Sequence, residues 1–152
     1  MATTSPTPAS TSNQIPPRYG PPITLARAKA VMAAAEAEAV RQGWPMVIAI
    51  VDSTGHLVLL ERLDQAQYAS VIIAQAKAET ALNFRRPTKS FEEAITAGGM
   101  GLRLLGVANL MPLEGGLPLL VDGEVVGAIG VSGMQSSQDA QVARAGIGAL
   151  AS

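Results

Sequence analysis

The chain has 152 residues, a length that fits a single domain with a substantial hydrophobic core. Its 11 basic and 12 acidic side chains nearly balance, the pI is near 5.8, and only 3% of residues are aromatic, so we expect neither a basic groove nor a stacking platform for nucleic acid. With no cysteine and one histidine, disulfides, thiolate nucleophiles and multi-histidine metal sites within one chain are excluded, and we predict no metal site.

The first 22 residues are rich in Thr, Ser and Pro and contain no apolar run of the signal-peptide type. We expect residues 1–22 to be a disordered tail on a cytoplasmic protein, and residues 23–152 to be one domain. The tail is either a flexible lead-in or a segment that lies over a neighbouring subunit. The mean hydropathy is +0.27, yet no apolar run is long enough for a membrane span, so the surplus favours a buried subunit interface.

A first helix is predicted over residues 25–42. Apolar side chains recur there at steps of three and four, Thr24 precedes them as a suitable N-cap, and Gly43 follows as a C-terminal stop. This pattern is typical of an amphipathic helix, whose role is packing. The apolar positions are Leu25, Ala28, Met32, Ala35 and Ala39.

A first hairpin follows this helix. Residues 46–51 form a continuous apolar run of strand length, residues 52–55 form a turn, and residues 56–61 return as a second strand. We expect the Asp52 side chain to cap the turn. His56 lies at the turn end of the return strand, which leaves two interpretations open: a partly exposed turn residue, or a heme ligand, metal ligand or general acid/base.

The segment from Ala66 to about Phe84 is predicted to be a helix. Its polar residues form one stripe, and Lys77 lies far from that stripe, on the face expected to be buried. Because a buried ammonium needs a partner, we consider an ion pair, a side chain that extends to solvent, and a contact with a ligand or a catalytic role. The carboxylates considered as partners are Asp52, Asp64 and Glu114.

Arg85 and Arg86 precede Pro87 and end the second helix, where they either complement its dipole or clamp a carboxylate. A further short helix is predicted over residues 90–97. The glycine-rich residues 98–101 are expected to be flexible, and residues 106–112 read as a short strand or a loop.

A second hairpin is predicted over residues 117–131, because two apolar runs flank Asp122-Gly123, a dipeptide suited to positive φ. Gly127 and Gly130 within it indicate that another backbone, a helix or a ligand approaches closely.

After Gly133 the sequence predicts a helix start, with Ser136 or Ser137 as N-cap and Asp139 in the first turn. A glycine turn beside a helix N-terminus can hold an anion on backbone N–H groups, and the alternative is a plain capped helix. The two hairpins, each followed by a helix, hint at a repeated ββα arrangement.

Three stretches carry a family resemblance: IAIVDSTGHLVLLERLD, AQAKAETALNFRRPT, and GGLPLLVDGEVVGAIGVSG with QDAQVARAG after it. In this order and spacing, over residues 24–150, they resemble the GlcG/HbpS-like family of heme-binding and heme-degrading proteins, which includes the C-terminal module of PduO-type corrinoid adenosyltransferases. The resemblance implies a profilin-like α/β fold, an antiparallel sheet of about five strands flanked by helices, and a homo-oligomer with pockets at or near subunit interfaces.

The resemblance implies heme binding or heme handling as the first candidate function, with His56 or Thr88 as the axial ligand. The family form after the arginine is RMDGA, whereas this chain has Gln65 in place of the glycine, which changes the local pocket. The further positions in the matching motifs are Asp52, Arg62, Asp64, Lys77, Gly115, Gly116, Ser132 and Asp139, of which Arg62, Gly115, Gly116 and Ser132 are predicted to bind the cofactor.

A second candidate function is a cofactor-independent lyase or isomerase that acts on a small acidic or aromatic catabolic metabolite at a subunit interface. Its catalytic residues would be Lys77, Asp64 and Glu114, with Lys77 as the base or electrostatic partner. A third candidate is a binding or sensor module without chemistry.

Overall fold

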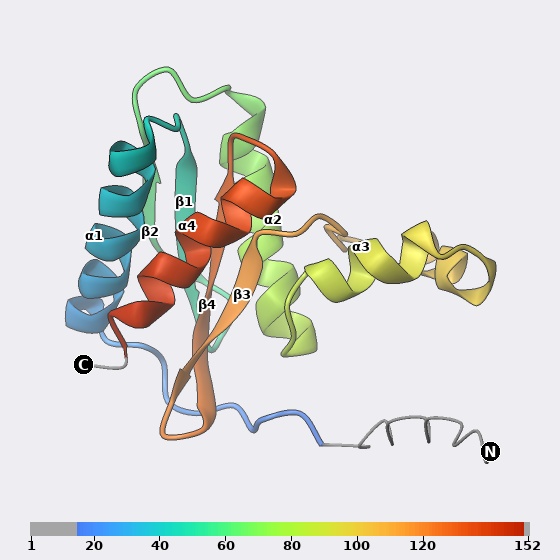
Figure 1. Cartoon of the computed structure of the whole chain (residues 1–152). Coiled ribbons are helices and arrows are strands. Elements are labelled where there is room, and N and C mark those ends of the chain that lie inside the picture. Colours follow the sequence, from blue (N-terminus) through green and yellow to red (C-terminus); the bar gives the residue numbers. More distant parts are fainter. Residues whose placement is uncertain (1–14, 151–152) are drawn as a thin grey trace, which may run out of the picture.

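Two ββα units build the fold (Figure 1), and the computed structural model describes residues 15–150. The repeated arrangement hinted at by the sequence is therefore present. The first unit consists of β1 (Val47–Asp52), β2 (Leu57–Arg62) and α2 (Ala69–Phe84), and the second of β3 (Gly116–Val121), β4 (Glu124–Ser132) and α4 (Ser136–Gly148). Helix α1 (Leu25–Gln42) precedes both units, and α3 (Lys89–Thr96) and the 3-10 helix η1 (Gly99–Gly106) lie between them.

The strands form an antiparallel sheet in the order β2-β1-β4-β3. The expected α/β class, an antiparallel sheet flanked by helices, is confirmed, but residues 15–150 contribute four strands rather than about five. The segment after Gly106 was predicted to be a short strand or a loop, and it is a loop. A side chain of α2 rather than a neighbouring strand binds its backbone there: Met111 N donates to Thr80 Oγ1 at 3.0 Å.

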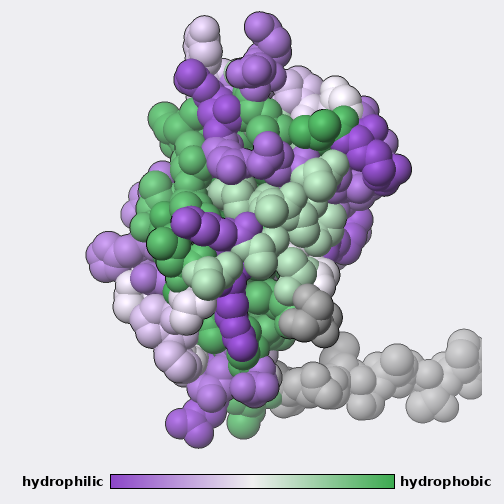
Figure 2. All heavy atoms as spheres, turned by 90° about the vertical axis from the view of Figure 1, so that its left-hand side faces the viewer, coloured by the Kyte–Doolittle hydropathy of each residue, from purple (hydrophilic) through white to green (hydrophobic). Residues whose placement is uncertain are grey.

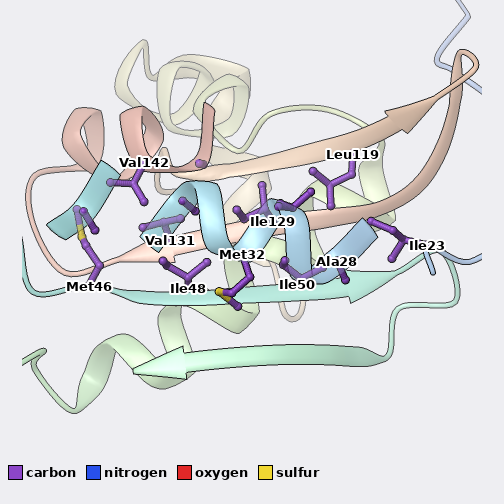
Figure 3. Packing of buried hydrophobic residues seen from close by; sticks show 14 of the residues in the cluster. Ile23, Ala28, Met32, Met46, Ile48, Ile50, Leu119, Ile129, Val131 and Val142 are labelled. Atoms are coloured by element: carbon purple, nitrogen blue, oxygen red, sulfur yellow. The ribbon is translucent and has the colours of Figure 1, made fainter. Parts of the chain in front are cut away.

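The sheet is covered by helices on both faces, with α1 and α4 on one side and α2 on the other (Figure 1). Alternate residues of β1 therefore enter two different cores: Ile48 and Ile50 pack toward α1 and α4 (Figure 3), whereas Val47, Ala49 and Val51 pack toward α2. Burial on both faces explains why residues 46–51 are apolar without interruption. All six of these residues are 0% exposed.

Helix α1 has the predicted bounds and caps. Thr24 Oγ1 accepts a hydrogen bond from Arg27 N at 3.2 Å, and Gly43 has a φ of 73°. Of the five apolar positions predicted to face the core, four are buried; Leu25, in the first turn at the edge of the buried stripe, is 52% exposed.

Two glycines of β4 let other backbone lie close to the strand, α2 at one of them and β1 at the other. A Cβ at Gly130 would come 2.0 Å from the carbonyl oxygen of Ala74 on α2, and one at Gly127 would come 2.3 Å from the carbonyl oxygen of Val51 on β1. The predicted close approach of other backbone at both glycines is therefore confirmed. The predicted hairpin turn is also present, with φ of 51° at Asp122 and 78° at Gly123.

The chain from Arg18 to Ile23 lies along β4. Strand β4 is longer than β1, and the N-terminal segment pairs with the end that β1 leaves free: Val125 N donates to Arg18 O at 2.8 Å and Gly20 N donates to Val125 O at 2.9 Å. Tyr19 Oη donates to Leu82 O at 2.8 Å. The end of the predicted disordered tail, residues 18–22, is thus held by hydrogen bonds, and its first part, residues 1–14, lies outside the described residues.

Helices α3 and η1 form an arm that projects from the sheet (Figure 1). The predicted short helix is present. Of the glycines after it, Gly101 is close-packed, since a Cβ there would come 1.9 Å from Ala94 O, whereas a Cβ at Gly98 or Gly99 would meet no atom within 4 Å. None of the helices within residues 15–150 combines the length and the apolar composition that a bilayer crossing requires.

Candidate functional site

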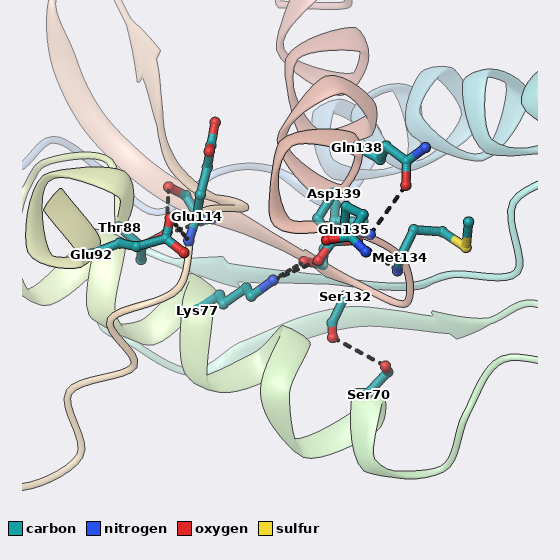
Figure 4. Close-up of polar contacts among 12 residues, drawn as sticks. Ser70, Lys77, Thr88, Glu92, Glu114, Ser132, Met134, Gln135, Gln138 and Asp139 are labelled. Atoms are coloured by element: carbon teal, nitrogen blue, oxygen red, sulfur yellow. Dashed lines mark hydrogen bonds and ion pairs between the residues drawn. The ribbon is translucent and has the colours of Figure 1, made fainter. Parts of the chain in front are cut away.

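A buried ion pair joins α2 to the first turn of α4 at one end of the sheet (Figure 4). Lys77, 1% exposed, donates from Nζ to Asp139 Oδ2 at 2.8 Å and to Val131 O at 2.9 Å. The ion-pair interpretation of Lys77 is confirmed, but its partner is wrong: neither Asp52, Asp64 nor Glu114 takes this place. Asp139 was predicted as a first-turn residue and as a position in a matching motif, but not as the partner of Lys77, because nothing local relates it to a lysine 62 positions away.

Asp139 also holds the glycine turn that precedes α4. Its Oδ1 accepts a hydrogen bond from Met134 N at 3.0 Å, so the anion at this turn is the protein's own carboxylate. Burial raises the pKa of Asp139, and the Lys77 ammonium and the Met134 N–H counteract that rise. The predicted N-cap, Ser136 or Ser137, is wrong: Gln135 caps the helix because it has extended backbone angles and exchanges hydrogen bonds with Gln138.

Two glycines at the start of β3 seal the ion pair. Gly115 has a φ of 130°, and a Cβ there would come 2.9 Å from Lys77 Nζ and 2.7 Å from Val131 O. A Cβ at Gly116 would come 2.3 Å from Lys77 O. Any other residue type would displace the lysine or α2, so these glycines serve the packing of the ion pair.

The predicted residues Thr88 and Ser132 are also buried near this end of the sheet. Thr88 Oγ1 accepts a hydrogen bond from Gly116 N at 2.9 Å, and Thr88 N donates to Gly116 O at 3.0 Å, which fixes the start of α3 to β3. Ser132 Oγ donates to Ser70 Oγ at 3.0 Å, and both serines are at most 4% exposed. Sequence reasoning had not singled out Ser70.

A small hollow of about 180 Å³ lies outside the glycines. Glu114 lies at its edge, with Oε1 3.9 Å from Lys89 Nζ, and its backbone N donates to Glu92 Oε2 at 3.3 Å (Figure 4). Two cations and one carboxylate thus border a space large enough for a small carboxylate-bearing molecule. The lining residues are Pro87, Lys89, Glu114, Gly115, Gly116, Leu117, Ala140 and Arg144.

His56 lies at the opposite end of the sheet. The strand register shows this, because Asp52 at the His56 turn pairs with Gly127, whereas Val47 at the other end of β1 pairs with Ser132. The structure therefore does not bring His56 together with the buried group around Lys77. Its imidazole is exposed.

The His56 turn is held by a chain of hydrogen bonds. Thr54 N donates to Asp52 Oδ1 at 2.8 Å, Thr54 Oγ1 also donates to Asp52 Oδ1, and Thr54 Oγ1 lies 2.8 Å from His56 Nδ1. The predicted turn-capping role of Asp52 is confirmed. Burial of Asp52 favours its protonated form, but the hydrogen bonds from Thr54 and His56 N outweigh this and lower its pKa.

The hydroxyl of Thr54 has one proton, and Asp52 receives it. In the neutral imidazole, Thr54 Oγ1 must then accept a hydrogen bond from His56, which assigns the single ring proton to Nδ1 and leaves a lone pair on Nε2. An orienting partner on one ring nitrogen and a lone pair on the other is the arrangement of a histidine that can bind a metal.

Arg62 ends β2 and Asp64 lies in the loop after it, and neither residue belongs to the buried group around Lys77 or to the His56 turn. The Arg62 guanidinium lies 5.6 Å from the centre of the Tyr68 ring, and Asp64 borders two open hollows of about 440 and 470 Å³. Gln65, which follows Asp64, has a φ of 66°, a left-handed conformation in which glycine is preferred. This chain therefore has glutamine where the family motif has glycine, but the backbone at this position keeps a conformation typical of glycine.

Comparison with known proteins gives consistent matches over most of the chain. Residues 23–148 match the family described as haem degrading protein HbpS-like. The chain is 43% identical over 105 residues to Protein GlcG of Escherichia coli strain K12, which covers 69% of this chain and 77% of that protein.

Two solved structures share the fold. The crystal structure of HbpS superposes with a TM-score of 0.79 at 30% identity, covering 86% of this chain and 92% of that one. A crystal structure of a PduOC:heme complex superposes with a TM-score of 0.76 at 26% identity, covering 84% of this chain and 94% of that one.

Proposed function

Because the chain belongs to the HbpS-like family of heme-degrading proteins, we propose that it binds heme and that His56 is the axial ligand. The observation that carries this proposal is the Asp52–Thr54–His56 chain, which leaves a lone pair on an exposed imidazole nitrogen. Support also comes from a structural neighbour that was crystallised as a heme complex. Heme iron is commonly held by histidine in this way, and when bound it would supply iron-centred chemistry.

The residues around the buried end fit heme iron less well. Thr88 is 0% exposed, and its hydroxyl oxygen already accepts a hydrogen bond from Gly116 N. The hollow beside it measures about 180 Å³, below the roughly 300 Å³ at which ligand pockets usually begin. We therefore place the iron at His56 and keep Thr88 as the alternative that the experiment must separate.

An exposed imidazole does not enclose a heme by itself. We propose that the protein forms a homo-oligomer and that a second subunit would complete the heme site. The orientation of the imidazole by Thr54 lowers the entropy lost on binding, because one ring rotamer and one tautomer are already selected.

Titration of the purified protein with hemin, followed at the Soret band, tests this assignment. We expect a shifted Soret band that His56→Ala removes or weakens at least tenfold. Thr54→Val keeps the imidazole but releases its orientation, and should weaken binding to a smaller extent. Thr88→Ala is the matched comparison: if it abolishes the band while His56→Ala leaves it unchanged, the iron is held at the other end of the sheet. No spectral change with the wild-type protein would refute heme binding itself.

A second candidate function is chemistry on a small acidic metabolite at the 180 Å³ hollow. Lys89 and Arg144 at its border would hold a carboxylate, and Glu114 would act as the acid or base. The predicted catalytic role of Lys77 would require its release from Asp139, because Gly115 separates its Nζ from the hollow. Asp64 lines other hollows, so its predicted role would need a neighbouring subunit.

Thermal stabilisation by small mono- and dicarboxylates measures occupancy of this hollow. Arg144→Gln should abolish the stabilisation, whereas Arg41→Gln, a change of the same type on α1, should leave it unaltered. Stabilisation that survives Arg144→Gln would show that the ligand binds elsewhere.

A further inference from the structure

The N-terminal segment 17–23, which we call the strap, crosses the end of the sheet at which the His56 turn, residues 52–56, lies (Figure 1). Near its start, Tyr19 Oη donates to Leu82 O in the last turn of α2 at 2.8 Å. At its end, Ile23 is 6% exposed in the core between the sheet and α1. The strap therefore passes from the face of the sheet covered by α2 to the face covered by α1.

A bulge in β4 holds the middle of the strap. The pairing of β3 with β4 shifts by one residue at Val126, and such a bulge disrupts the ladder of hydrogen bonds locally. The carbonyls of the consecutive residues Val125 and Val126 both accept hydrogen bonds from the strap, from Gly20 N and Ile23 N, each at 2.9 Å. The strap is therefore fixed along its length and not only at its ends.

The strap supports the His56 turn from both faces of the sheet. On the α1 face, a Cβ built on Gly127 would come 3.3 Å from Ile23 Cγ2 and 3.4 Å from Asp52 Cα, so Ile23 packs beside the residue whose carboxylate holds the turn. On the α2 face, Leu82 Cδ2 lies 3.5 Å from the position of a Cβ on Gly55, within the turn. The turn is thus packed between Ile23, which belongs to the strap, and Leu82, to which the strap binds.

A cation–π contact fixes Tyr19 against the end of α2. The Arg85 guanidinium lies 5.1 Å from the centre of the Tyr19 ring, and Arg85 Nη1 donates to Pro17 O at 3.2 Å. The last carbonyls of a helix lack partners within it, and Tyr19 Oη supplies one here, 2.8 Å from Leu82 O and 3.1 Å from Asn83 O. The position of Leu82, and with it the packing of the His56 turn, therefore depends on the strap.

Water competes for the hydrogen bonds of the His56 turn. Thr54 and His56 are exposed, and hydrophilic side chains dominate the lower end of the molecule in Figure 2, the end at which the turn lies. A hydrogen bond that water can replace contributes little net stabilisation. The Asp52–Thr54–His56 chain therefore needs packing around it to select one arrangement of the imidazole.

We propose that the strap clamps the His56 turn and that Tyr19 is a positioning residue for the His56 imidazole. Tyr19 acts on Leu82, which supports the turn, and through the turn on the hydrogen bond between Thr54 and His56. The resulting effect on heme affinity rests on the proposed function, whereas the effect on the imidazole itself does not. The two effects are therefore measured separately.

The single histidine permits a test without heme, because its imidazole gives one set of nitrogen signals in NMR spectra. At about pH 8.5, at which imidazoles are neutral, we expect the wild type to hold its ring proton on Nδ1 and Tyr19→Phe to show an increased population with the proton on Nε2. Tyr68→Phe is the matched control, because Arg62 lies 5.6 Å from the centre of that ring and the pair lies at the other end of β2. An unchanged tautomer in Tyr19→Phe, or an equal change in Tyr68→Phe, would overturn the clamp.

A glycine of the strap gives a second variant. A Cβ at Gly20 would come 2.8 Å from Glu124 Cβ, so Gly20→Ala should move the strap away from β4 and shift the ring proton in the same direction as Tyr19→Phe. Gly106→Ala is its control, because a Cβ there would meet no atom within 4 Å. A Gly20→Ala protein that keeps the wild-type tautomer would contradict the clamp.

Hemin titration tests the positioning role of Tyr19. Tyr19→Phe should weaken hemin binding about two- to tenfold, the range expected for the loss of one hydrogen bond, and Tyr68→Phe should not weaken it. Because Tyr19→Phe and Thr54→Val release the same imidazole, the double variant should bind hemin no more weakly than Thr54→Val alone, and additive losses would refute the positioning role. If the wild type binds no hemin while Tyr19→Phe still shifts the ring proton, the proposed function fails and the clamp stands.

Discussion

Removal of one partner of the Lys77–Asp139 pair distinguishes a structural role from a catalytic one. In Lys77→Met, the apolar stem is retained and the ammonium is lost. The Asp139 carboxylate, which is 2% exposed, then keeps only backbone N–H partners, those of Met134 and Gly133. Breaking a buried pair in this way destabilises proteins by about 3–5 kcal/mol. That is a large part of the total stability of a domain, which is about 5–15 kcal/mol.

The magnitude follows from the geometry of the pair. At the 2.8 Å between Nζ and Oδ2, two unit charges attract by about 6 kcal/mol at an effective dielectric constant of 20. Desolvation of the two ions opposes this attraction by several kcal/mol each, so the net stabilisation is small while both ions are present. The loss appears when one ion is left alone.

A double-mutant cycle isolates this effect. Lys77→Met and Asp139→Leu should each destabilise the protein, whereas Lys77→Met combined with Asp139→Leu should recover most of the loss, because no charge is left buried. Urea unfolding followed by circular dichroism measures the free energy of unfolding. If Lys77→Met alone lowers that free energy by less than about 1 kcal/mol, the pair is not structural, and Lys77 is free to act on a ligand.

Three further predictions concern single positions. Gln65→Gly should raise the free energy of unfolding by up to about 1 kcal/mol, because Gln65 has a left-handed φ of 66°; a lower urea midpoint would refute this. Gly130→Ala should lower the free energy of unfolding by at least about 1–3 kcal/mol, because the new Cβ would meet the backbone oxygen of Ala74. Gly148→Ala is the control, because open space surrounds that glycine and the free energy of unfolding should not fall. Burial and the neighbouring Glu36 raise the pKa of Glu61, so the native state takes up a proton that the unfolded state does not; wild-type stability should rise relative to Glu61→Gln as the pH falls from 7 toward 4.5.

Local sequence signals predicted most of the elements. The N-cap Thr24, the stop at Gly43 and the Asp122-Gly123 turn act through neighbouring residues, so they can be read from the chain directly. The failures concern places where distant contacts decide. The loop after Gly106 was ambiguous because Thr80, some 30 residues earlier, supplies its hydrogen bond.

The site was predicted in its components but not in its arrangement. Lys77 was identified because an ammonium on a buried helix face needs a partner, yet the partner depends on where α4 begins relative to α2. Gly115 and Gly116 were predicted to bind the cofactor, and the structure adds a packing role against Lys77 that the sequence did not indicate. Local patterns identify which residues are unusual, but they do not reveal which of them meet.

Register along β1 places the two polar groups at opposite ends of the sheet, and this separation has a functional consequence. A strand of six residues spans about 20 Å, so His56 and the Lys77–Asp139 pair share no neighbour. Changes at distant sites without shared partners usually add. The effect of His56→Ala on heme affinity should therefore be the same in the wild type as in the stability-restored Lys77→Met, Asp139→Leu background. Within one subunit the two ends share no contacting residue. Non-additive effects would therefore mean that the two ends are coupled through a second subunit.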